Sequence, residues 1–185
     1  MAKAALFVGS EGARGVPKMR IKRPALPTSS PEEFAGIATG TAFAGKKLDI
    51  FSVYGAVKFV GVLWMADLAR RYPDFRLLSV SPGGTQGTET ANVLPGGMRF
   101  FYNRIYMPVL APMFGLAHSL QTGAKRVMDG LVDPSFKSGH FYGTKANTLT
   151  GPFVDQSEIF ADLGNATVQR NAAEAVNCFV WLTRK

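Results

Sequence analysis

A long apolar helix between two short strands constrains the fold of this chain more than any other feature of its sequence. Residues 53–71 repeat apolar side chains at spacings of three and four, which predicts a helix that is buried along one stripe. Residues 2–8 and 75–81 are short apolar runs that end at glycine-containing turns, and they predict strands. Two strands joined through a helix lie parallel in one sheet, so the sequence predicts an α/β fold. The predicted buried stripe consists of Val53, Val57, Val60, Trp64 and Leu68.

The rest of the chain extends this unit into one domain of residues 1–185. Residues 119–133 have helical periodicity, and residues 140–143 predict a third short strand. Residues 167–182 predict a closing helix. The sequence therefore predicts about three strands, each flanked by helices.

Two segments carry weaker signals of regular structure. Residues 11–50 are rich in Pro, Gly and Ser and predict a loop insertion, within which Ser30 caps a short helical turn. Residues 84–118 mix Gly and Pro with Phe, Tyr and Met, which predicts an apolar flap with one or two short helices. The first segment holds the densest basic cluster, and we expect that cluster to be solvated because few rings accompany it. Its members are Arg14, Lys18, Arg20, Lys22 and Arg23.

Tyr54 and Lys58 lie four residues apart at the start of the predicted long helix. This spacing places both side chains on one face of the helix, one above the other. A free phenol has a pKa near 10, and an ammonium group held close to it lowers that pKa toward neutrality. The pair is therefore a candidate for general acid–base catalysis, although the spacing alone is also common by chance.

Charge and composition limit the choice of compartment and partner. A net charge of +8 fits nucleic acid, an anionic membrane or a phosphorylated ligand, and charge alone does not choose among them. Residues 105–124 contain no Asp, Glu, Lys or Arg, but Pro108, Pro112 and His118 argue against a membrane span. With Cys178 as the single cysteine and no targeting pattern, we expect a cytoplasmic protein. Two histidines and one cysteine predict no metal site.

The order of these features resembles the C-terminal half of the short-chain dehydrogenase/reductase family. In order they are a strand ending in a serine, Tyr-x-x-x-Lys on the next helix, and a strand ending in Pro-Gly. Further along, LQTGAKRVMDGLVDPSFKSGHFYG is similar to the penultimate helix and last strand of the family. The resemblance covers nearly the whole chain and implies the C-terminal half of a Rossmann-like doubly wound parallel sheet. In this reading residues 92–119 correspond to the variable substrate lid.

The resemblance implies a catalytic role for three residues. Tyr54 corresponds to the general acid/base that exchanges a proton with the alcohol or carbonyl oxygen of the substrate. Lys58 corresponds to the lysine that lowers the pKa of that tyrosine and binds the nicotinamide ribose. Ser10 corresponds to the serine that holds the substrate oxygen, with Ser29 and Ser30 as rivals nearer in sequence to Tyr54.

The resemblance also implies a cofactor and a substrate class. Pro82 and Gly83 correspond to the turn whose backbone approaches the nicotinamide, and Thr85 corresponds to a residue whose amide contacts the carboxamide. Thr88 lies one position later than the phosphate-binding threonine of the family. The expected cofactor is NAD or NADP, and the apolar flap suggests a small apolar carbonyl or alcohol substrate.

Full-length members of the family also have four earlier strands and a glycine-rich turn that binds the pyrophosphate. Gly9, Gly12 and Gly15 do not have the spacing of that turn, and they lie too close to Tyr54 for the intervening strands. The first hypothesis is therefore a truncated reductase that needs an N-terminal half. The second is an inactive remnant that binds partners or forms a homo-oligomer through the Tyr54 helix. A third, a basic nucleic-acid binder, is disfavoured, so we expect no nucleic-acid partner.

Overall fold

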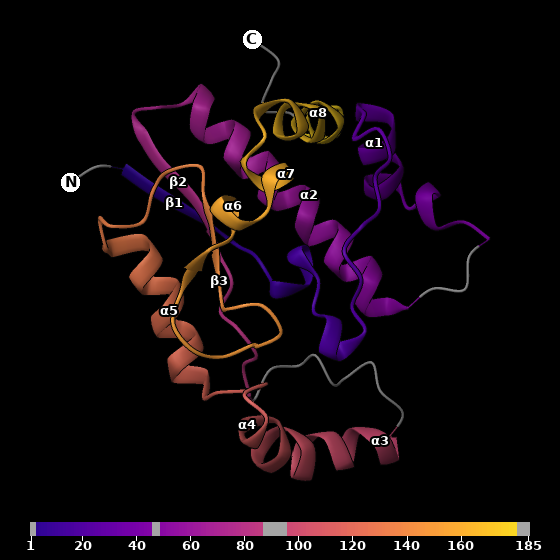
Figure 1. Cartoon of the computed structure of the whole chain (residues 1–185), viewed down its shortest axis with the longest axis vertical. Coiled ribbons are helices and arrows are strands. Elements are labelled where there is room, and N and C mark those ends of the chain that lie inside the picture. Colours follow the sequence, from indigo (N-terminus) through magenta and orange to yellow (C-terminus); the bar gives the residue numbers. More distant parts are fainter. Residues whose placement is uncertain (1–2, 46–48, 87–95, 181–185) are drawn as a thin grey trace.

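The structure is a computed structural model that describes residues 3–45, 49–86 and 96–180, and its centre is a four-stranded mixed sheet (Figure 1). The strand order is β1-β2-β3-β4. β2 is parallel to both β1 and β3, and β4 is antiparallel to β3. The prediction of an α/β fold with parallel neighbouring strands is confirmed, and β4 is an additional strand. The strands are β1 (Lys3–Val8), β2 (Phe75–Val80), β3 (Phe141–Gly143) and β4 (Val154–Asp155).

Backbone pairing between neighbouring strands brings the carboxyl ends of β1, β2 and β3 together. β1 and β2 pair in register from Lys3 opposite Phe75 to Val8 opposite Val80. Beyond β1, the Gly9 amide donates to the Val80 carbonyl at 2.8 Å. The amide of Ser81 likewise donates to the Tyr142 carbonyl at 2.8 Å. The segments that follow β1, β2 and β3 therefore lie side by side at one end of the sheet.

β1 is an edge strand, and the prediction that residues 2–8 form a buried strand is wrong in this respect. Lys3 to Ala5 are exposed, and Val8 is 44% exposed. Among the described residues β1 pairs only with β2, so one side of its backbone has no neighbouring strand. Burial is confined to Leu6 and Phe7, which are covered by helices on opposite faces of the sheet.

The long helix α2 (Ile50–Arg71) covers one face of the sheet, and α5 (Leu120–Val132) covers the other (Figure 1). A Cβ atom added to Gly61 of α2 would lie 2.4 Å from the Phe7 ring, and one added to Gly130 of α5 would lie 2.7 Å from Leu6. These glycines allow the helices to approach β1 closely. The sheet is therefore covered on both faces, as parallel sheets usually are.

Helix α2 begins three residues earlier than predicted because Asp49 provides its N-cap. The Asp49 carboxylate accepts hydrogen bonds from the amides of Phe51 and Ser52, both at 3.2 Å. Ser52 lies inside the helix and donates its hydroxyl to Asp49 at 2.8 Å. The helix ends where expected, at Arg71.

The predicted buried stripe of α2 is wrong for most of its members, although Val60 is buried as expected. Val57 is 52% exposed, and Trp64 and Leu68 are only half-buried. Almost every side chain of this helix is apolar, so periodicity identifies the helix without selecting the arc that packs. The sheet on one side and α8 (Ala166–Asn177) with the turn after β1 on the other decide the buried arc. Its apolar members are Ala56, Phe59, Val60, Val62, Leu63, Met65, Ala66 and Ala69.

The segment predicted as a loop insertion, residues 11–50, contains more regular structure than expected. Ser30 caps α1 as predicted, accepting from the Glu33 amide at 3.4 Å, and α1 packs beside α8 through Phe34 and Ile37 (Figure 1). Residues 46–48 of this segment lie outside the described residues. Its elements are η1 (Glu11–Arg14), η2 (Pro17–Met19), α1 (Pro31–Thr39) and η3 (Thr41–Phe43).

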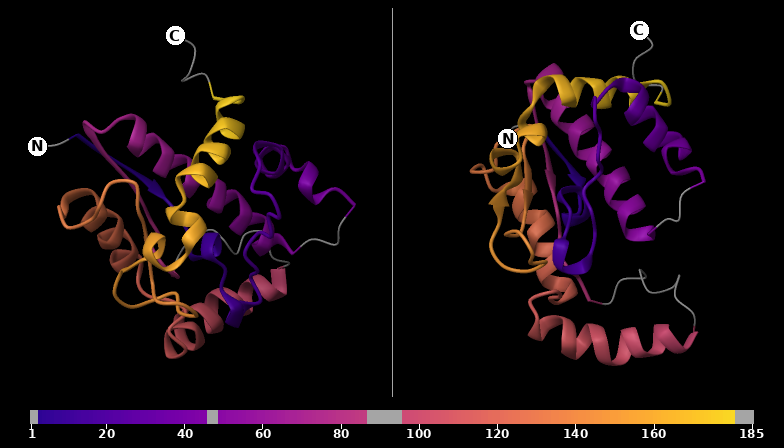
Figure 2. Two further views of the ribbon diagram at one scale, coloured as in Figure 1. Left: turned by 45° about the horizontal axis from the view of Figure 1, so that its top comes forward. Right: turned by 45° about the vertical axis from the view of Figure 1, so that its right-hand side comes forward.

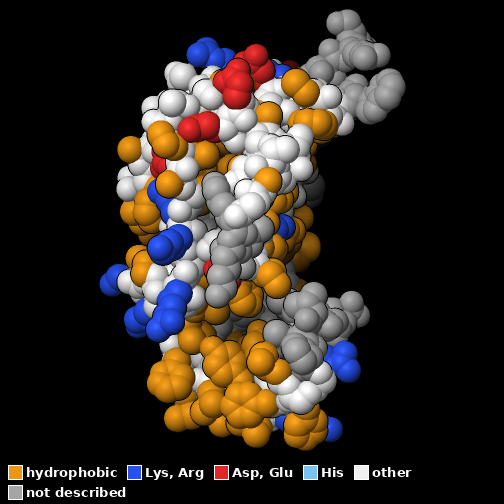
Figure 3. Space-filling view, turned by 90° about the vertical axis from the view of Figure 1, so that its right-hand side faces the viewer, with side chains coloured by type: hydrophobic (Ala, Val, Ile, Leu, Met, Phe, Trp, Pro, Cys, Tyr) orange, Lys and Arg blue, Asp and Glu red, His pale blue; other side chains and the backbone are white. Residues whose placement is uncertain are grey.

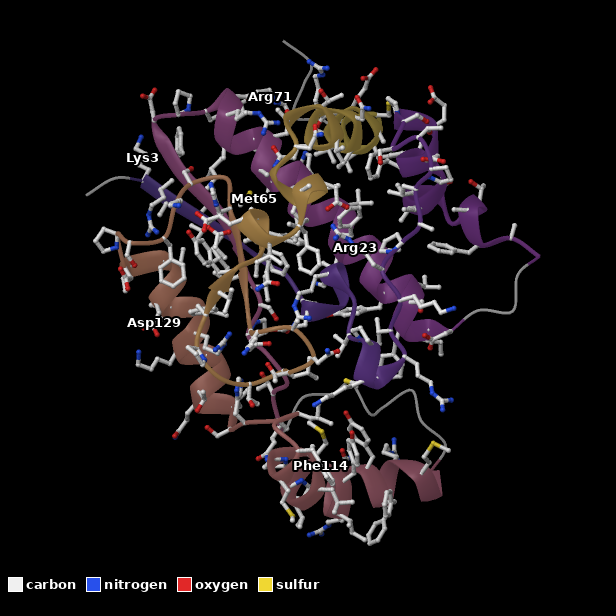
Figure 4. All side chains as sticks on the ribbon, viewed as in Figure 1. Lys3, Arg23, Met65, Arg71, Phe114 and Asp129 are labelled. Atoms are coloured by element: carbon white, nitrogen blue, oxygen red, sulfur yellow. The ribbon has the colours of Figure 1, made fainter. Side chains whose placement is uncertain are left out.

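The basic cluster of this segment is not wholly solvated, which corrects the expectation. Arg14 is buried and donates to the carbonyl oxygens of Lys145 and Thr148 at 3.1 and 3.0 Å. Arg23 pairs with Asp162 and lies over the Phe160 ring, 4.6 Å from its centroid, between α2 and the short helices near the C-terminus (Figure 4). These two guanidinium groups join distant segments of the chain.

The segment predicted as a flap forms a nearly continuous helical run at one end of the molecule, beyond the strand ends (Figure 2). We call residues 96–113 the outer helical segment; residues 87–95 lie outside the described residues. Its three parts are α3 (Gly96–Phe101), a π-helical part (Tyr102–Leu110) and α4 (Ala111–Met113).

The C-terminal part confirms helix 119–133 and the closing helix, which ends earlier than predicted, at Asn177. The short helices α6 (Gln156–Ile159) and α7 (Ala161–Gly164) were not predicted. Among the described residues, α2 alone is long and apolar enough to cross a membrane by length and composition, but half of that stretch is buried inside the protein. This is weak evidence, since core helices share these properties.

Candidate functional site

A cavity of about 240 Å³ lies at the carboxyl ends of the strands, between the start of α2, the turn after β2 and the outer helical segment. Most of its lining is apolar or aromatic, and the hydroxyls of Tyr54, Thr85, Tyr102 and Tyr106 are its side-chain polar groups. The remaining lining residues are Met19, Pro82, Gly83, Gly84, Met107, Leu116 and Leu149.

Tyr54 reaches this cavity from the second turn of α2. The next residue, Gly55, packs against the turn after β1, since a Cβ added to it would lie 2.6 Å from the Gly12 carbonyl oxygen. A Cβ added to Gly12 would lie 3.6 Å from the Tyr54 ring. The two glycines allow α2 to approach the end of β1, and the Tyr54 side chain remains 47% exposed beside the cavity.

The Lys58 ammonium lies next to the Tyr54 ring, as their spacing predicts. Its Nζ is 5.6 Å from the centroid of the Tyr54 ring and 5.2 Å from that of Phe7. It also donates a hydrogen bond to the carbonyl oxygen of Val8 at 3.0 Å. Partial burial lowers the pKa of Lys58. The lysine is thus held between the end of β1 and the candidate tyrosine.

Ser10 lies at the end of β1, but it is not among the residues that line the cavity. It caps η1, and its Oγ accepts a hydrogen bond from the Gly12 amide at 3.1 Å. Its rivals are engaged elsewhere: Ser30 caps α1, and Ser29 donates its hydroxyl to the Leu26 carbonyl at 3.4 Å. The structure therefore brings Tyr54 and Lys58 together and leaves Ser10 outside the lining of the cavity.

The turn after β2 brings Pro82, Gly83 and Thr85 to the cavity opposite Tyr54. The Gly83 amide donates to the Ser81 hydroxyl at 3.1 Å, and the Thr85 hydroxyl donates to the Gly83 carbonyl at 3.3 Å. Gly83 has a φ of 83°, and a Cβ added there would lie 2.5 Å from the Leu149 carbonyl oxygen. The turn is thus a fixed wall of the cavity. Thr88 lies outside the described residues.

His118 holds this turn through a contact with its backbone. Its Nε2 is 2.8 Å from the Pro82 carbonyl oxygen. A carbonyl only accepts, so Nε2 carries the proton in this contact. Burial lowers the pKa of His118, and the nearby Arg126 cation lowers it further, while the hydrogen bond to Pro82 and the Glu11 carboxylate act in the opposite direction.

Tyr102 and Tyr106 form the wall contributed by the outer helical segment, and the sequence analysis did not single them out as site residues. Their rings stack with centroids 5.4 Å apart. Burial raises the pKa of Tyr102, with a smaller contribution from Tyr106. Gln86 ties this wall to the turn after β2 by donating to the Met107 carbonyl at 2.9 Å. The four-residue spacing of Tyr102 and Tyr106 indicates that both lie on one face of a helix. Nothing in the sequence indicates that Met19 lines the same cavity.

A buried polar cluster supports the strand ends behind the cavity, and it too was missed. The Glu11 carboxylate is 2% exposed and accepts hydrogen bonds from the Ser81 hydroxyl and from the Thr144 amide, the latter at 3.1 Å. Arg126, from α5, lies 3.9 Å above the Phe153 ring and donates to the Gly151 carbonyl at 2.5 Å. The burial of Arg126 lowers its pKa, whereas Glu11 raises it. The cluster joins the segments that follow β1, β2 and β3.

The cavity is smaller than a site for a whole dinucleotide. Sites for drug-sized ligands and cofactors usually occupy about 300–1,000 Å³, which exceeds the 240 Å³ found here. Its backbone turn and hydroxyl groups suit a flat polar ring or a small carbonyl compound. No pyrophosphate-binding turn is present among the described residues around it, so a whole dinucleotide needs additional surface.

A second group of side chains has donor atoms close enough to consider a metal, although the sequence predicted no metal site. Ligand atoms of His140, Asp155 and Glu158 lie within 4.8 Å of one another. Each already has protein partners: His140 Nδ1 lies 2.7 Å from Asp155 Oδ2, and Glu158 pairs with the Lys137 ammonium. Protein hydrogen bonds and ion pairs thus account for this arrangement.

A scan against models of protein families finds no match for this chain, and a search of curated proteins finds no similar sequence. The functional argument therefore rests on the residues and their geometry.

Proposed function

We propose that this chain is the catalytic half of an NAD(P)-dependent short-chain oxidoreductase that acts on a small apolar carbonyl or alcohol. The observation that carries this proposal is the cavity between Tyr54 and the Pro82–Gly83 turn, with the Lys58 ammonium beside the tyrosine ring. The resemblance of Tyr-x-x-x-Lys and the Pro-Gly strand end to that family, which involves the same residues, also supports it. NAD or NADP, when bound, supplies the hydride chemistry.

Each residue of the chain has a defined role in this proposal. The Tyr54 hydroxyl donates a proton to the carbonyl oxygen during reduction and accepts it back during oxidation. The Lys58 ammonium lies beside the Tyr54 ring and is available to a ribose hydroxyl of the cofactor. Ser10 is assigned to orient the substrate oxygen by donating its hydroxyl proton, which it can do while its Oγ still accepts from the Gly12 amide.

The turn after β2 and the two stacked tyrosines confine the substrate. Pro82, Gly83 and Thr85 form the nicotinamide side of the cavity. Tyr102 and Tyr106 cover the other side with aromatic surface, which favours an apolar substrate and excludes water from the proton transfer. Thr88 remains a candidate for phosphate contact.

Two observations support the dependence of activity on an N-terminal half. The cavity is smaller than a dinucleotide site, and the unpaired backbone edge of β1 is available to a further parallel strand. A dinucleotide in this type of fold binds where the strand order reverses, which would lie beyond β1. An N-terminal half-domain that contributes a glycine-rich turn would complete both the sheet and the cofactor site.

The test is NAD(P)H oxidation with aromatic and aliphatic aldehydes, after co-expression with the N-terminal half-domain of a short-chain reductase. Tyr54→Phe is expected to lower kcat/KM by about 10²–10⁴-fold, since it removes the acid/base group and keeps the ring. Tyr72→Phe is the matched control, because Tyr72 ends the same helix and is 48% exposed. A folded mixture that stays inactive, or equal activity of Tyr54→Phe and Tyr72→Phe, contradicts the proposal.

A second candidate function is a partner-binding or oligomerisation module without catalysis. It is favoured by the exposed apolar start of α2, where Ile50 is 70%, Phe51 is 47% and Val57 is 52% exposed. Sedimentation velocity distinguishes this candidate, because a chain that stays monomeric over a wide concentration range lacks the homo-oligomer. Activity that is lost with Tyr54→Phe in an unchanged assembly supports the first proposal instead.

A further inference from the structure

The outer helical segment carries a large apolar face toward solvent, at the end of the molecule beyond the strands (Figures 3 and 4). We call this face the outer apolar face. Its exposed fractions range from 44% for Ile105 to 75% for Met113. Contiguous exposed apolar surface on this scale usually marks an interaction site. Its members are Met98, Phe100, Phe101, Ile105, Val109 and Met113, together with Phe114, which directly follows the segment.

The outer apolar face is distinct from the face that lines the cavity. Tyr102, Tyr106 and Met107 point to the cavity and are half-buried, and Ala111 is buried. The two sets alternate along the helical segment, which therefore has one face on the protein and another toward solvent. At about 1.5 Å per residue the segment is roughly 27 Å long, long enough to lie along a surface.

The charged residues within 96–118 are all of one sign. Arg99 and Arg104 lie within the segment and are exposed, and residues 96–118 contain no Asp or Glu. In the view of Figure 3, Lys and Arg side chains border the apolar surface, while most acidic side chains lie at the opposite end of the molecule. An apolar face with aromatic residues and flanking cations is typical of segments that lie in a membrane interface.

We propose that the outer helical segment docks this protein onto the surface of a bilayer that contains anionic lipids. Phe100, Phe101 and Phe114 would enter the boundary between headgroups and acyl chains, and the arginines would contact lipid phosphates. The segment lies along the membrane and does not cross it, because its inner face is already packed on the protein. A second copy of the chain fits less well. A two-fold contact would place Arg99 and Arg104 near their own copies without acidic partners.

Docking through this face would also give the cavity a source of substrate, a consequence that rests on the proposed function. The same segment lines the cavity with Tyr102 and Tyr106, so a carbonyl compound dissolved in the bilayer would have a short path to Tyr54. The lipid contact itself does not require catalysis. Failure of the enzyme assay would therefore leave the docking proposal intact, and the reverse also holds.

The test is co-sedimentation of the purified chain with phosphatidylcholine vesicles, with and without phosphatidylglycerol. We expect binding to vesicles that contain phosphatidylglycerol, weaker binding to phosphatidylcholine alone, and a loss of the difference at high salt. Phe100→Ser with Phe114→Ser is expected to reduce the partition coefficient by about tenfold or more. Arg99→Gln and Arg104→Gln should each reduce it about fivefold for anionic vesicles only.

Val132→Ser with Ile159→Ser is the matched control, because these apolar residues are 68% and 55% exposed on α5 and α6, away from the outer apolar face. Circular dichroism verifies that each variant is folded, and the arginine variants remain informative if the phenylalanine variant is not. Absence of vesicle binding overturns the proposal, and so does equal binding of the control and the phenylalanine variant. A phenylalanine variant that only dissociates a dimer assigns the face to a second copy and overturns it as well.

Discussion

His118 shows how one half-buried side chain links the cavity wall to the pH of the solution. It donates from Nε2 to the Pro82 carbonyl and lies near the charges of Glu11 and Arg126. Its folded-state pKa is lowered below its usual value of about 6.5, mainly because of burial. The neutral ring is therefore the form that the fold stabilises.

The expected consequence is a loss of folding stability as the pH falls below about 6.5. Above that pH the ring is neutral in both states, so the contribution of His118 is fully present. Below it the unfolded chain binds a proton that the folded chain does not, so the free energy of unfolding decreases. His118→Gln keeps a donor for Pro82 without this titration. Urea unfolding across the pH series should therefore give a flatter profile for the variant, and identical profiles would contradict the prediction.

At the residue scale, sequence reasoning identified the residues with a local pattern and missed those assembled from distant segments. Tyr54 and Lys58 were found because one helical turn relates them. The Glu11 cluster is built from the ends of three strands and from α5, and nothing in the sequence near Glu11 indicates those partners. Arg14 was misassigned to solvent for the same reason, since its acceptors lie more than 130 residues away.

At the scale of elements, the position of α2 depends on close backbone approach at two glycines. Gly55 allows the turn after β1 to contact the helix directly behind Tyr54, and Gly61 accommodates the Phe7 ring. The order of strands and helices was predictable from periodicity and turns. The start of α2, the arc it buries and the two-residue strand β4 were not, because capping and tertiary contacts decide them.

Gly55→Ala is expected to destabilise the protein, although alanine favours a helix by up to about 1 kcal/mol. The new methyl group would lie 2.6 Å from the Gly12 carbonyl oxygen, which is backbone and cannot turn aside. Overpacking of this kind costs about 1–3 kcal/mol, so the net free energy of unfolding should fall. Urea denaturation measures the change.

Gly97→Ala provides the control for that substitution. Gly97 lies in α3, and a Cβ added to it meets no atom within 4 Å. The free energy of unfolding of the Gly97→Ala protein should equal that of the unaltered protein or rise slightly. A Gly55→Ala protein as stable as the Gly97→Ala protein would show that α2 and the turn after β1 separate without cost.

At the scale of the whole molecule, the exposed edge of β1 is the feature most consequential for behaviour in solution. Within the described part of the chain, six residues of extended backbone pair on one side only, and Val8 and Phe75 add exposed apolar surface at 44% and 39%. Such an edge is a template for a further strand, whether from a partner domain or from another copy of the chain.

Ala5→Lys is expected to reduce self-association of the isolated chain. Ala5 is exposed on β1, and a lysine on an edge strand disfavours pairing with another strand. Sedimentation velocity over a concentration series should show less increase in apparent mass than for the unaltered chain. Ala25→Lys, at an exposed position in the segment 11–50, adds the same charge away from β1 and should have no effect. A similar reduction in both variants would assign the change to net charge.

The opposite edge strand of the sheet is β4, which pairs with β3 through only two residues. An edge strand this short offers almost no backbone for pairing with another chain, whereas β1 offers six residues. If two molecules paired through β1, each would use the long edge strand of its described sheet. Neither molecule would then have a second long edge strand for further pairing. Self-association would then stop at the dimer, so this chain at high concentration should form discrete dimers and not fibrils.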